Sequence, residues 1–269
     1  YRVPDTVDYL FCTSFGNAFQ LKSLIIENMS ASCATYTFYG CDITIYGKNG
    51  SKMQQLINEK VLSGNLSFKE ASKFKPSGFD NFIFVNDYSY YMFWDVSEEK
   101  WYYENVKNAY ELGLMVGSEF CFNPEDDMTI AEAITLAVRL HSIYNKGTED
   151  IGESEIWYDA YVDYARENGI ATKTYSNYSA PATRAQVAEI FVNSLPDDAL
   201  AEVNSVADNK IPDVSVSDSF GPAVYKLYKA GILTGGSDGL FRPYDTVSRA
   251  EAAAIVTRLS KPDFRQVFN

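Results

Sequence analysis

The feature that most constrains this chain is internal repetition in its second half. Trp101-Tyr102 recurs 56 residues later as Trp157-Tyr158, and the segment from Gly113 to Gly117 recurs 118 residues later from Gly231 to Gly235. A repeated unit of this length is one supersecondary element that buries its apolar face only against its neighbours. We therefore predict three copies, which span residues 93–146, 151–196 and 211–261.

Each copy is predicted to form two helices joined by a loop. The second helix of each opens with a capping box, in which a hydroxyl and a Glu or Gln side chain accept from each other's backbone N–H groups. The boxes pair Thr129 with Glu132, Thr183 with Gln186, and Ser248 with Glu251. Because a two-helix unit cannot bury its apolar face alone, we expect a mainly α fold with a central three-helix bundle of pseudo-threefold symmetry.

The N-terminal part follows a shorter period of 22 to 23 residues. Alternating apolar residues predict short strands near Leu24 and Ile43, and Ser51 is expected to cap a short helix. We expect a small α/β solenoid at residues 1–62, closed by that helix. A packed aromatic connector is expected at residues 63–92, because its many aromatic residues argue against disorder.

Composition excludes several functions. The 269 residues include 23 Lys and Arg against 36 Asp and Glu, a formal charge of −13, which disfavours nucleic acid as a partner. No apolar run reaches the roughly 20 residues of a membrane-spanning helix, so no membrane insertion is predicted. The single His leaves little for a metal site or a Ser–His or Cys–His pair. The aromatic content of 15% is instead typical of interfaces and wet binding surfaces.

Four other groups of residues, of three kinds, are interpreted as structural, so we predict a non-catalytic protein without cofactor or metal. Carboxylate pairs are common on an acidic surface, a glycine-flanked turn lacks the alternating oxygen ligands of a calcium loop, and a Cys and a His fall on opposite sides of a helix start. They are Glu125 to Asp127, Asp159 with Asp163, residues 236–239, and Cys121 with His141.

The cysteines bear on the redox state of the chain, and the first residue bears on whether the chain is part of a longer protein. The spacings of Cys12, Cys33, Cys41 and Cys121 match no zinc or redox motif, which favours buried free thiols and leaves disulfide pairing open. The chain begins at Tyr1 with no signal segment, so we expect it to be a piece of a longer protein.

Arg184 and Arg249 are the strongest functional candidates that spacing alone provides. Each occupies the first position of a capped helix, where the helix dipole disfavours a cation. A helix N-terminus with free N–H groups and an adjacent guanidinium would hold a carboxylate or a phosphate. The alternative is an Arg that bridges to a nearby carboxylate such as Asp245, and spacing favours neither. The first copy has Ile130 at this position and should bind an anion weakly or not at all.

These motifs resemble the S-layer homology domain, whose pattern is Phe-x-Asp-Val, an aromatic, Gly-Ile-x-x-Gly, Phe-x-Pro and Thr-Arg-Ala-Glu. The first copy carries Phe93-Trp-Asp95-Val96, and the third carries Phe241-Arg-Pro243. The resemblance implies a threefold prism of three repeats at the bacterial cell surface. Such a prism would anchor the protein non-covalently to an anionic secondary cell-wall polysaccharide, typically one that bears a pyruvate ketal.

The resemblance also implies site residues. In that family the motif Arg contacts the ketal carboxylate, which would assign this role to Arg184 and Arg249, while Asp, Gly and aromatic positions shape grooves between repeats. The second copy lacks the Asp-Val segment and the first lacks the Arg, so occupancy of all three grooves is in doubt. The implied groove-lining residues are Asp95, Asp213, Trp101, Trp157, Gly113, Gly169 and Gly231.

The N-terminal segment resembles the leucine-rich repeats of bacterial surface antigens, through Thr37-Phe38-Tyr-Gly-Cys41 and Ile43-Thr-Ile-Tyr-Gly47. This resemblance implies that residues 1–62 end a longer solenoid and that further domains precede Tyr1. An alternative function therefore stays open. The chain could be a structural or protein–protein interaction module of a larger surface protein, with ligand recognition by the leucine-rich segment.

Overall fold

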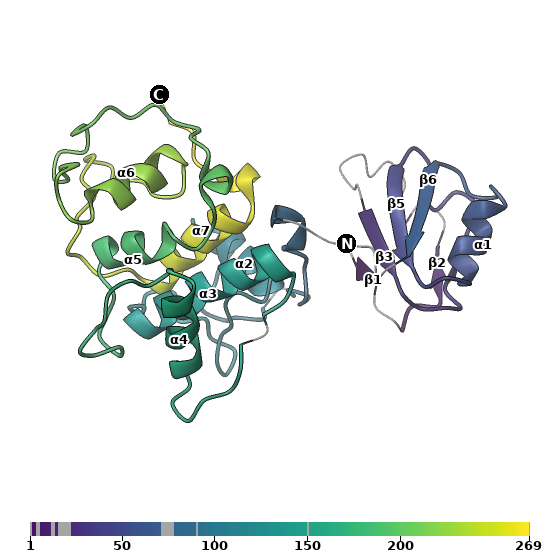
Figure 1. Ribbon diagram of the computed structural model, residues 1–269, viewed down its shortest axis with the longest axis horizontal. Coiled ribbons are helices and arrows are strands. Elements are labelled where there is room, and N and C mark those ends of the chain that lie inside the picture. The colour runs from purple at the N-terminus through teal and green to yellow at the C-terminus, as the bar shows by residue number, and fades with distance from the viewer. Residues whose placement is uncertain are drawn as a thin grey trace. The chain divides into compact units, whose positions relative to one another are not determined.

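The computed structural model describes residues 2–3, 6–11, 14–15, 23–70, 78–89, 91–149 and 151–268. The chain divides into two compact units, Tyr1–Pro76 and Ser77–Asn269 (Figure 1). Each has its own apolar core, and each is described separately below.

The first unit is built on parallel strands. Strands β1 (Arg2–Val3), β3 (Ser23–Ile26), β5 (Asp42–Gly47) and β6 (Asn65–Glu70) form a four-stranded sheet in that order. A second parallel pair joins β2 (Tyr9–Leu10) to β4 (Ser32–Cys33). Val3 pairs with Ile26 and Ile43 pairs with Leu66, so each coil takes 23 residues at these points. The strands predicted near Leu24 and Ile43 are present, and the leucine-rich repeat assignment stays a prediction.

The predicted end of the solenoid is wrong. Helix α1 (Lys52–Asn58) is present with Ser51 as its N-cap, and it buries Met53. It does not close the solenoid, because β6 follows it and pairs with β5 along its whole length. The expected connector at residues 63–92 is therefore divided. Its first part belongs to this sheet, and residues 79–92 contribute Phe79, Phe82, Tyr88 and Met92 to the core of the second unit.

The described cysteines are free thiols. Cys33 and Cys41 are buried, and Cys121 is half-buried. Burial raises the pKa of Cys33 to about 11, which makes it an inert core thiol rather than a nucleophile. Cys12 lies outside the described residues.

The second unit contains three helix pairs. The first pair is α2 (Tyr103–Glu111) and α3 (Ile130–Lys146), the second is α4 (Asp159–Glu167) and α5 (Arg184–Phe191), and the third is α6 (Gly221–Lys229) and α7 (Arg249–Ser260). All three predicted capping boxes are formed. Short 3-10 helices occur at Gly78–Asn81, Asp197–Leu200 and Pro262–Phe264.

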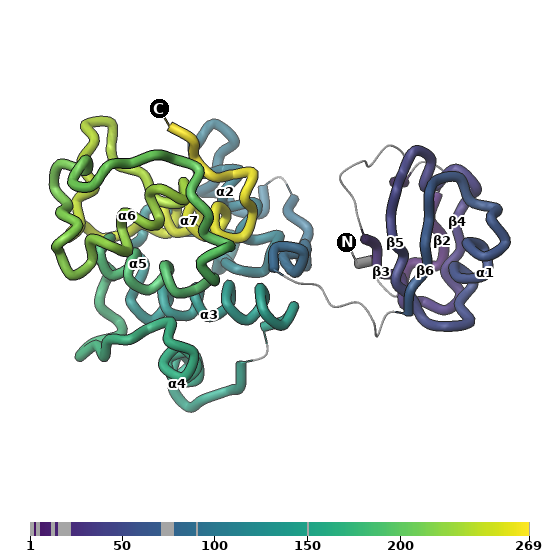
Figure 2. The backbone as a smooth tube through the Cα atoms, turned by 45° about the horizontal axis from the view of Figure 1, so that its top comes forward, coloured from purple at the N-terminus to yellow at the C-terminus, as the bar shows by residue number. Residues whose placement is uncertain are grey.

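The helix pairs interlock instead of folding as separate hairpins. The first helix of each pair packs against the second helix of the preceding pair, so α4 lies on α3, α6 lies on α5, and α2 completes the cycle on α7 (Figure 2). Helix α3 also packs against α5 and α7. Each pair therefore depends on its neighbours for burial, as the repetition predicted.

The loops before the three capped helices hydrogen-bond to one another in a closed ring. Met128 N–H donates to the Val247 carbonyl at 2.8 Å, Val247 N–H donates to the Ala182 carbonyl at 3.1 Å, and Ala182 N–H donates to the Met128 carbonyl at 2.8 Å. Each loop gives and receives one bond, so the three loops are joined directly to one another.

Short segments ahead of the first and third pairs extend the repeated unit. The N–H groups of Val85 and Asn86 donate to the Glu111 carbonyl at the end of α2, and those of Val203 and Asn204 donate to the Lys229 carbonyl at the end of α6. The offset of 118 residues seen in the motifs thus begins upstream of residue 93. These segments satisfy helix C-terminal carbonyls that would otherwise lack partners.

Candidate functional site

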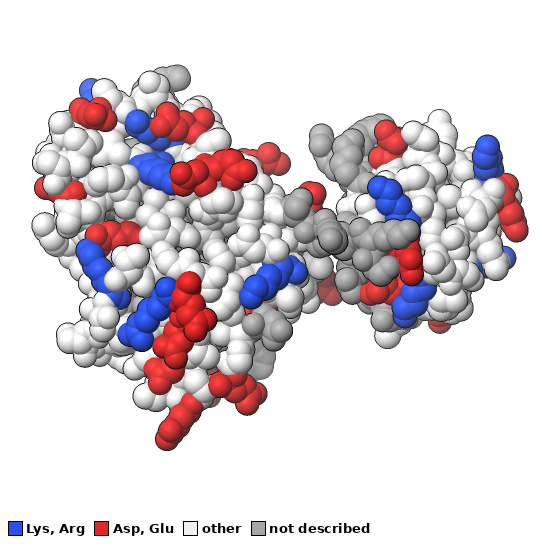
Figure 3. Space-filling model, in the orientation of Figure 1, with Lys and Arg blue, Asp and Glu red and all other residues white. Residues whose placement is uncertain are grey.

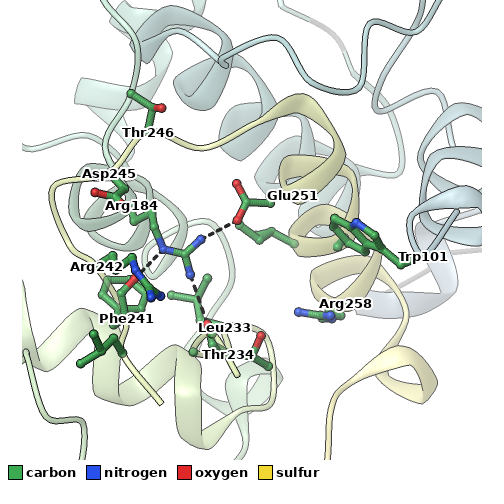
Figure 4. Close-up of a pocket in the computed structure, with 15 residues that line it drawn as sticks. Trp101, Arg184, Leu233, Thr234, Phe241, Arg242, Asp245, Thr246, Glu251 and Arg258 are labelled. Carbon is green, nitrogen blue, oxygen red and sulfur yellow. Dashed lines mark hydrogen bonds and ion pairs between the residues drawn. The ribbon is translucent and has the colours of Figure 1, made fainter. Parts of the chain in front are cut away.

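Two cavities lie at corresponding places between the helix pairs. The larger, groove 1, has a volume of about 390 Å³, and Trp101, Arg184, Glu251 and Arg258 are among its lining residues (Figure 4). The smaller, groove 2, has a volume of about 210 Å³ and is lined by residues that include Trp157, Arg249, Glu132 and Arg139. Each groove is lined by a Trp of one helix pair, an Arg of the next pair and further residues of the third pair.

Arg184 holds two helix pairs together. Its Nε donates to the Phe241 carbonyl at 2.7 Å, Nη1 to Glu251 Oε1 at 2.7 Å, and Nη2 to the Thr234 carbonyl at 3.1 Å. The guanidinium also lies 4.9 Å from the centre of the Phe241 ring. Only 16% of the side chain is exposed. Figure 4 shows these three partners around the guanidinium, whose donor groups are therefore directed at the protein itself.

Arg249 repeats this arrangement between the third and first pairs. Its Nε donates to the Phe122 carbonyl at 2.9 Å and its Nη2 to the Val116 carbonyl at 2.8 Å, while Nη1 lies 3.5 Å from Glu132 Oε1. The side chain is 18% exposed. Both motif arginines thus bridge to the capping glutamate of the neighbouring pair, a tertiary role that explains a cation at a helix N-terminus.

The helix N-terminal N–H groups are not free, which contradicts the anion-site interpretation in its simplest form. At α5, Arg184 N–H donates to the Asp245 carbonyl and Ala185 N–H to the Pro243 carbonyl. At α7, the first two N–H groups likewise donate to the Asp126 and Pro124 carbonyls. The alternative interpretation, an ion pair between the Arg and a carboxylate, is correct. The carboxylate that pairs with Arg184 is that of Glu251 and not that of Asp245.

The third interface, between the first and second helix pairs, has uncharged residues at all three positions that carry the Arg, the Glu and the second Arg at the other two interfaces. Ile130 replaces the motif Arg, and Gln186 stands where the other capping boxes have Glu132 and Glu251. Seven residues after Gln186 comes Asn193, where the other two helices carry Arg139 and Arg258. This interface therefore has neither the Arg nor its Glu partner, as expected because either charge alone would be left unneutralised.

Among the described residues, Arg258 supplies the guanidinium of groove 1 that has no carboxylate partner. Its Nη1 donates to the Ile232 carbonyl at 2.9 Å, and across the described part of the chain no ion pair involves it. Burial lowers the pKa of Arg258, although a guanidinium remains protonated at any physiological pH. Its side chain and that of Trp101 both line groove 1 (Figure 4). Arg258 recurs 119 residues after Arg139, but it belongs to none of the motifs that predicted site residues.

Trp101 is among the residues that line groove 1, and Trp157 is among those that line groove 2. Each immediately precedes the N-cap of a first helix, Tyr102 or Tyr158, and meets that ring edge to face. Trp101 is 62% exposed and Trp157 is 55% exposed, so each presents a large apolar surface at the edge of its groove. Ser219 stands at the corresponding position before the N-cap Phe220 of α6.

Asp95 and Asp213 do not line either cavity. The Asp95 carboxylate accepts from the N–H groups of Phe122 and Asn123 at 2.8 and 2.6 Å, and Asp213 accepts in the same way from Phe241 and Arg242. These bonds fix the loop that carries the buried Phe of each Phe-x-Pro motif. Both aspartates thus hold loops in place, and neither borders the two grooves that the resemblance implies they line.

The three motif glycines also lie outside both cavities. Gly113, Gly169 and Gly231 follow the first helices with φ values of 70°, 69° and 70°, a left-handed conformation that terminates a helix. A Cβ on Gly231 would lie 2.5 Å from the Gln266 carbonyl oxygen, whereas a Cβ on Gly169 would meet nothing within 4 Å.

This contrast gives a matched pair of substitutions. Gly169→Ala should cost about 1 kcal/mol of unfolding free energy from backbone strain alone. Gly231→Ala should cost more, because the added methyl group must also displace the chain at Gln266. Urea denaturation followed by circular dichroism measures both. Equal losses would show that the close approach at Gly231 is not a constraint.

Other candidate groups show structural partners. His141 Nδ1 lies 3.1 Å from the Tyr164 hydroxyl, and burial lowers the pKa of its imidazole. Within the described ranges, no cluster of three or more His, Cys, Asp or Glu side chains is placed to hold a metal ion. Across the same residues, no helix has both the length and the apolar character needed to cross a bilayer.

Comparison with known proteins agrees with the sequence motifs. The family model of the S-layer homology domain matches residues 93–134 and 210–253, the predicted first and third copies. The surface-layer 125 kDa protein of Lysinibacillus sphaericus is 28% identical over 179 residues, which cover 61% of this chain and 15% of that protein. An endoglucanase of Bacillus sp. (strain KSM-635) is 26% identical over 181 residues, 62% of this chain and 18% of that protein.

The chain thus carries S-layer homology domain sequence at two positions, and these matches indicate a cell-surface or cell-wall location. It spans less than a fifth of the length of either relative. The S-layer homology domain is a non-catalytic anchoring module, so the likeness to an endoglucanase carries no hydrolytic activity over to this chain.

Proposed function

We propose that the second unit anchors the protein to an anionic polysaccharide of the cell wall by binding it in groove 1. The observation that carries this proposal is the combination of an exposed indole, Trp101, with the unpaired guanidinium of Arg258 in one cavity. An indole face packs against the apolar face of a sugar ring, and a guanidinium binds a carboxylate through paired hydrogen bonds. A sugar that bears a pyruvate ketal carries both features on one ring.

We also propose that residues 151–196 form the second of three repeats in a threefold prism. Three features support this: the capping box at Thr183, the closed ring of loop hydrogen bonds, and the use of Trp157 in groove 2. The third interface, which has Ile130, Gln186 and Asn193 in place of the charged residues, is proposed to bind no anion.

Attraction to the glycan must be local, because the chain as a whole is acidic. On the face shown in Figure 3, basic side chains of the second unit are interspersed with acidic ones and form no continuous basic surface. The lining of groove 1 is different, since Arg184 pairs with Glu251 and Arg242 with Asp238, which leaves the Arg258 guanidinium without a carboxylate among the described residues. The net charge of −13 therefore opposes long-range steering while the groove itself favours an anion.

Co-sedimentation with purified wall sacculi tests the proposal. The chain should bind intact sacculi and should bind much less after mild acid removes the ketals. Trp101→Ala should weaken binding by about tenfold, since aromatic stacking is worth roughly 0.5–1.5 kcal/mol or more. Trp94→Ala is the matched control, because Trp94 is 76% exposed and lies outside both cavities.

Two outcomes would contradict this function. Equal binding to intact and ketal-free sacculi would remove the anionic glycan as the ligand. Failure of soluble wall polysaccharide to displace the bound chain would indicate docking to a wall protein instead.

A further inference from the structure

We propose that the Arg139 guanidinium of groove 2 is neutralised by the protein's own Glu149, which does not itself line the groove, in the way that a ligand carboxylate neutralises Arg258 in groove 1. This inference rests on the proposed function. It makes the two grooves unequal, with the Arg258 cation of groove 1 available to the wall glycan and the Arg139 cation of groove 2 neutralised until Glu149 is displaced.

The two grooves hold their arginines in the same way. Arg139 Nη1 donates to the Leu114 carbonyl at 2.9 Å, as Arg258 Nη1 donates to the Ile232 carbonyl at 2.9 Å, and these carbonyls are related by the 118-residue offset. The two arginines differ at the Nε atom. Arg139 Nε donates to Glu149 Oε1 at 2.8 Å, whereas the described residues offer Arg258 no carboxylate.

A second side chain holds Glu149 in place. The Tyr161 hydroxyl of α4 donates to the same oxygen, Glu149 Oε1, at 2.5 Å. Burial, and next the hydrogen bond with Glu149, raises the pKa of Tyr161 and keeps its proton on the hydroxyl. The 56-residue offset places Asn105 at the corresponding point of α2, beside groove 1. In the described residues, groove 1 therefore has no counterpart of the Glu149 carboxylate and no counterpart of the Tyr161 hydroxyl that holds it.

The position of Glu149 in the chain makes it an effective competitor. It lies three residues beyond the end of α3 and two beyond Gly147, so its carboxylate stays close to Arg139. A tethered group of this kind competes at an effective concentration in the millimolar range or above. A single sugar carboxylate from outside must exceed that concentration or bind through further contacts. Groove 2 is thus charge-neutral at Arg139, while groove 1 retains its cation.

Glu149→Gln tests this directly. The probe is a monovalent methyl glycoside of a hexosamine that bears a pyruvate ketal, titrated by calorimetry and by the indole ¹⁵N–H resonances of the three Trp residues. The wild-type chain should bind one probe and shift the Trp101 resonance. Glu149→Gln should bind a second probe at groove 2, at least about tenfold tighter than the wild type binds there, and should also shift Trp157.

Three controls isolate the cause. Glu153→Gln removes the same charge from the same linker, where the exposed Glu153 makes no ion pair in the described residues, and it should behave as the wild type. Arg139→Gln added to Glu149→Gln should abolish the gain at Trp157. Tyr161→Phe removes one of the two groups that hold Glu149 and should give a smaller gain, which provides a second test if Glu149→Gln is unstable.

The outcomes separate this inference from the proposed function. One bound probe in both proteins, with Trp157 unmoved in Glu149→Gln and in Tyr161→Phe, would overturn the inference and leave the proposed function standing. Two bound probes in the wild type would also overturn it. No binding by any of these proteins would overturn the proposed function and the inference together.

Discussion

Replacing Arg184 with Ala is expected to lower the free energy of unfolding of the second unit by about 2–3 kcal/mol. The substitution removes three hydrogen bonds between helix pairs and leaves the Glu251 carboxylate without its cation. The Phe241 and Thr234 carbonyls lose a charged donor at the same time. Because the pair is mostly screened from water, little of this loss is recovered by solvation.

Urea denaturation of Arg184→Ala, followed by circular dichroism, provides the measurement. Arg166→Ala is the matched control, because Arg166 forms an exposed ion pair with Asp163 and should contribute no more than about 1 kcal/mol. A double-mutant cycle with Glu251→Gln, which keeps the capping box, should give a coupling of about 1 kcal/mol or more. Wild-type stability in Arg184→Ala, combined with lost glycan binding, would instead return this Arg to the ligand-contact role that the resemblance implies.

Replacing Arg258 with Gln is expected to weaken binding to wall polysaccharide by about 10- to 100-fold, the equivalent of one charge-assisted contact of roughly 1.5–3 kcal/mol. The folded state should change little, because the Arg258 side chain makes a single hydrogen bond in the described structure, to the Ile232 carbonyl. The affinity of Arg258→Lys for wall polysaccharide should lie between those of the wild type and Arg258→Gln, since an ammonium keeps the charge but not the paired geometry.

The two arginines are thus expected to divide stability and binding between them. Arg184→Ala should mainly affect unfolding, and Arg258→Gln should mainly affect affinity for sacculi. Wild-type binding by Arg258→Gln would show that the unpaired guanidinium is not the anion receptor of groove 1.

Much of the fold could be predicted because its determinants are local. The three capping boxes and the helix after Ser51 each depend on residues three or four positions apart, so a sequence read alone reveals them. Strand β6 was missed because only Leu66 and Phe68 alternate in it, next to a segment rich in Gly, Ser and Pro. Its pairing with β5 is a tertiary contact that local pattern does not specify.

The site was predicted in part, for a similar reason. Trp101, Trp157 and the motif arginines do reach the two grooves, but the partners of those arginines lie far away in sequence. Arg184 meets Glu251 across 67 residues, and Arg249 meets Phe122 across 127. One sequence signal could have found the Arg–Glu pairing. The helix pair that receives Ile130 instead of an Arg is also the one with Gln186 in its capping box.

Binding of an anionic wall glycan in groove 1 is tested most directly by the indole resonance of Trp101. The chain has three Trp residues, so its three indole ¹⁵N–H signals can be assigned by single substitution. Titration with ketal-bearing wall polysaccharide should shift the Trp101 signal and leave Trp94 unchanged, and ketal-free polysaccharide should shift neither. Binding that leaves the Trp101 signal unmoved would contradict the account.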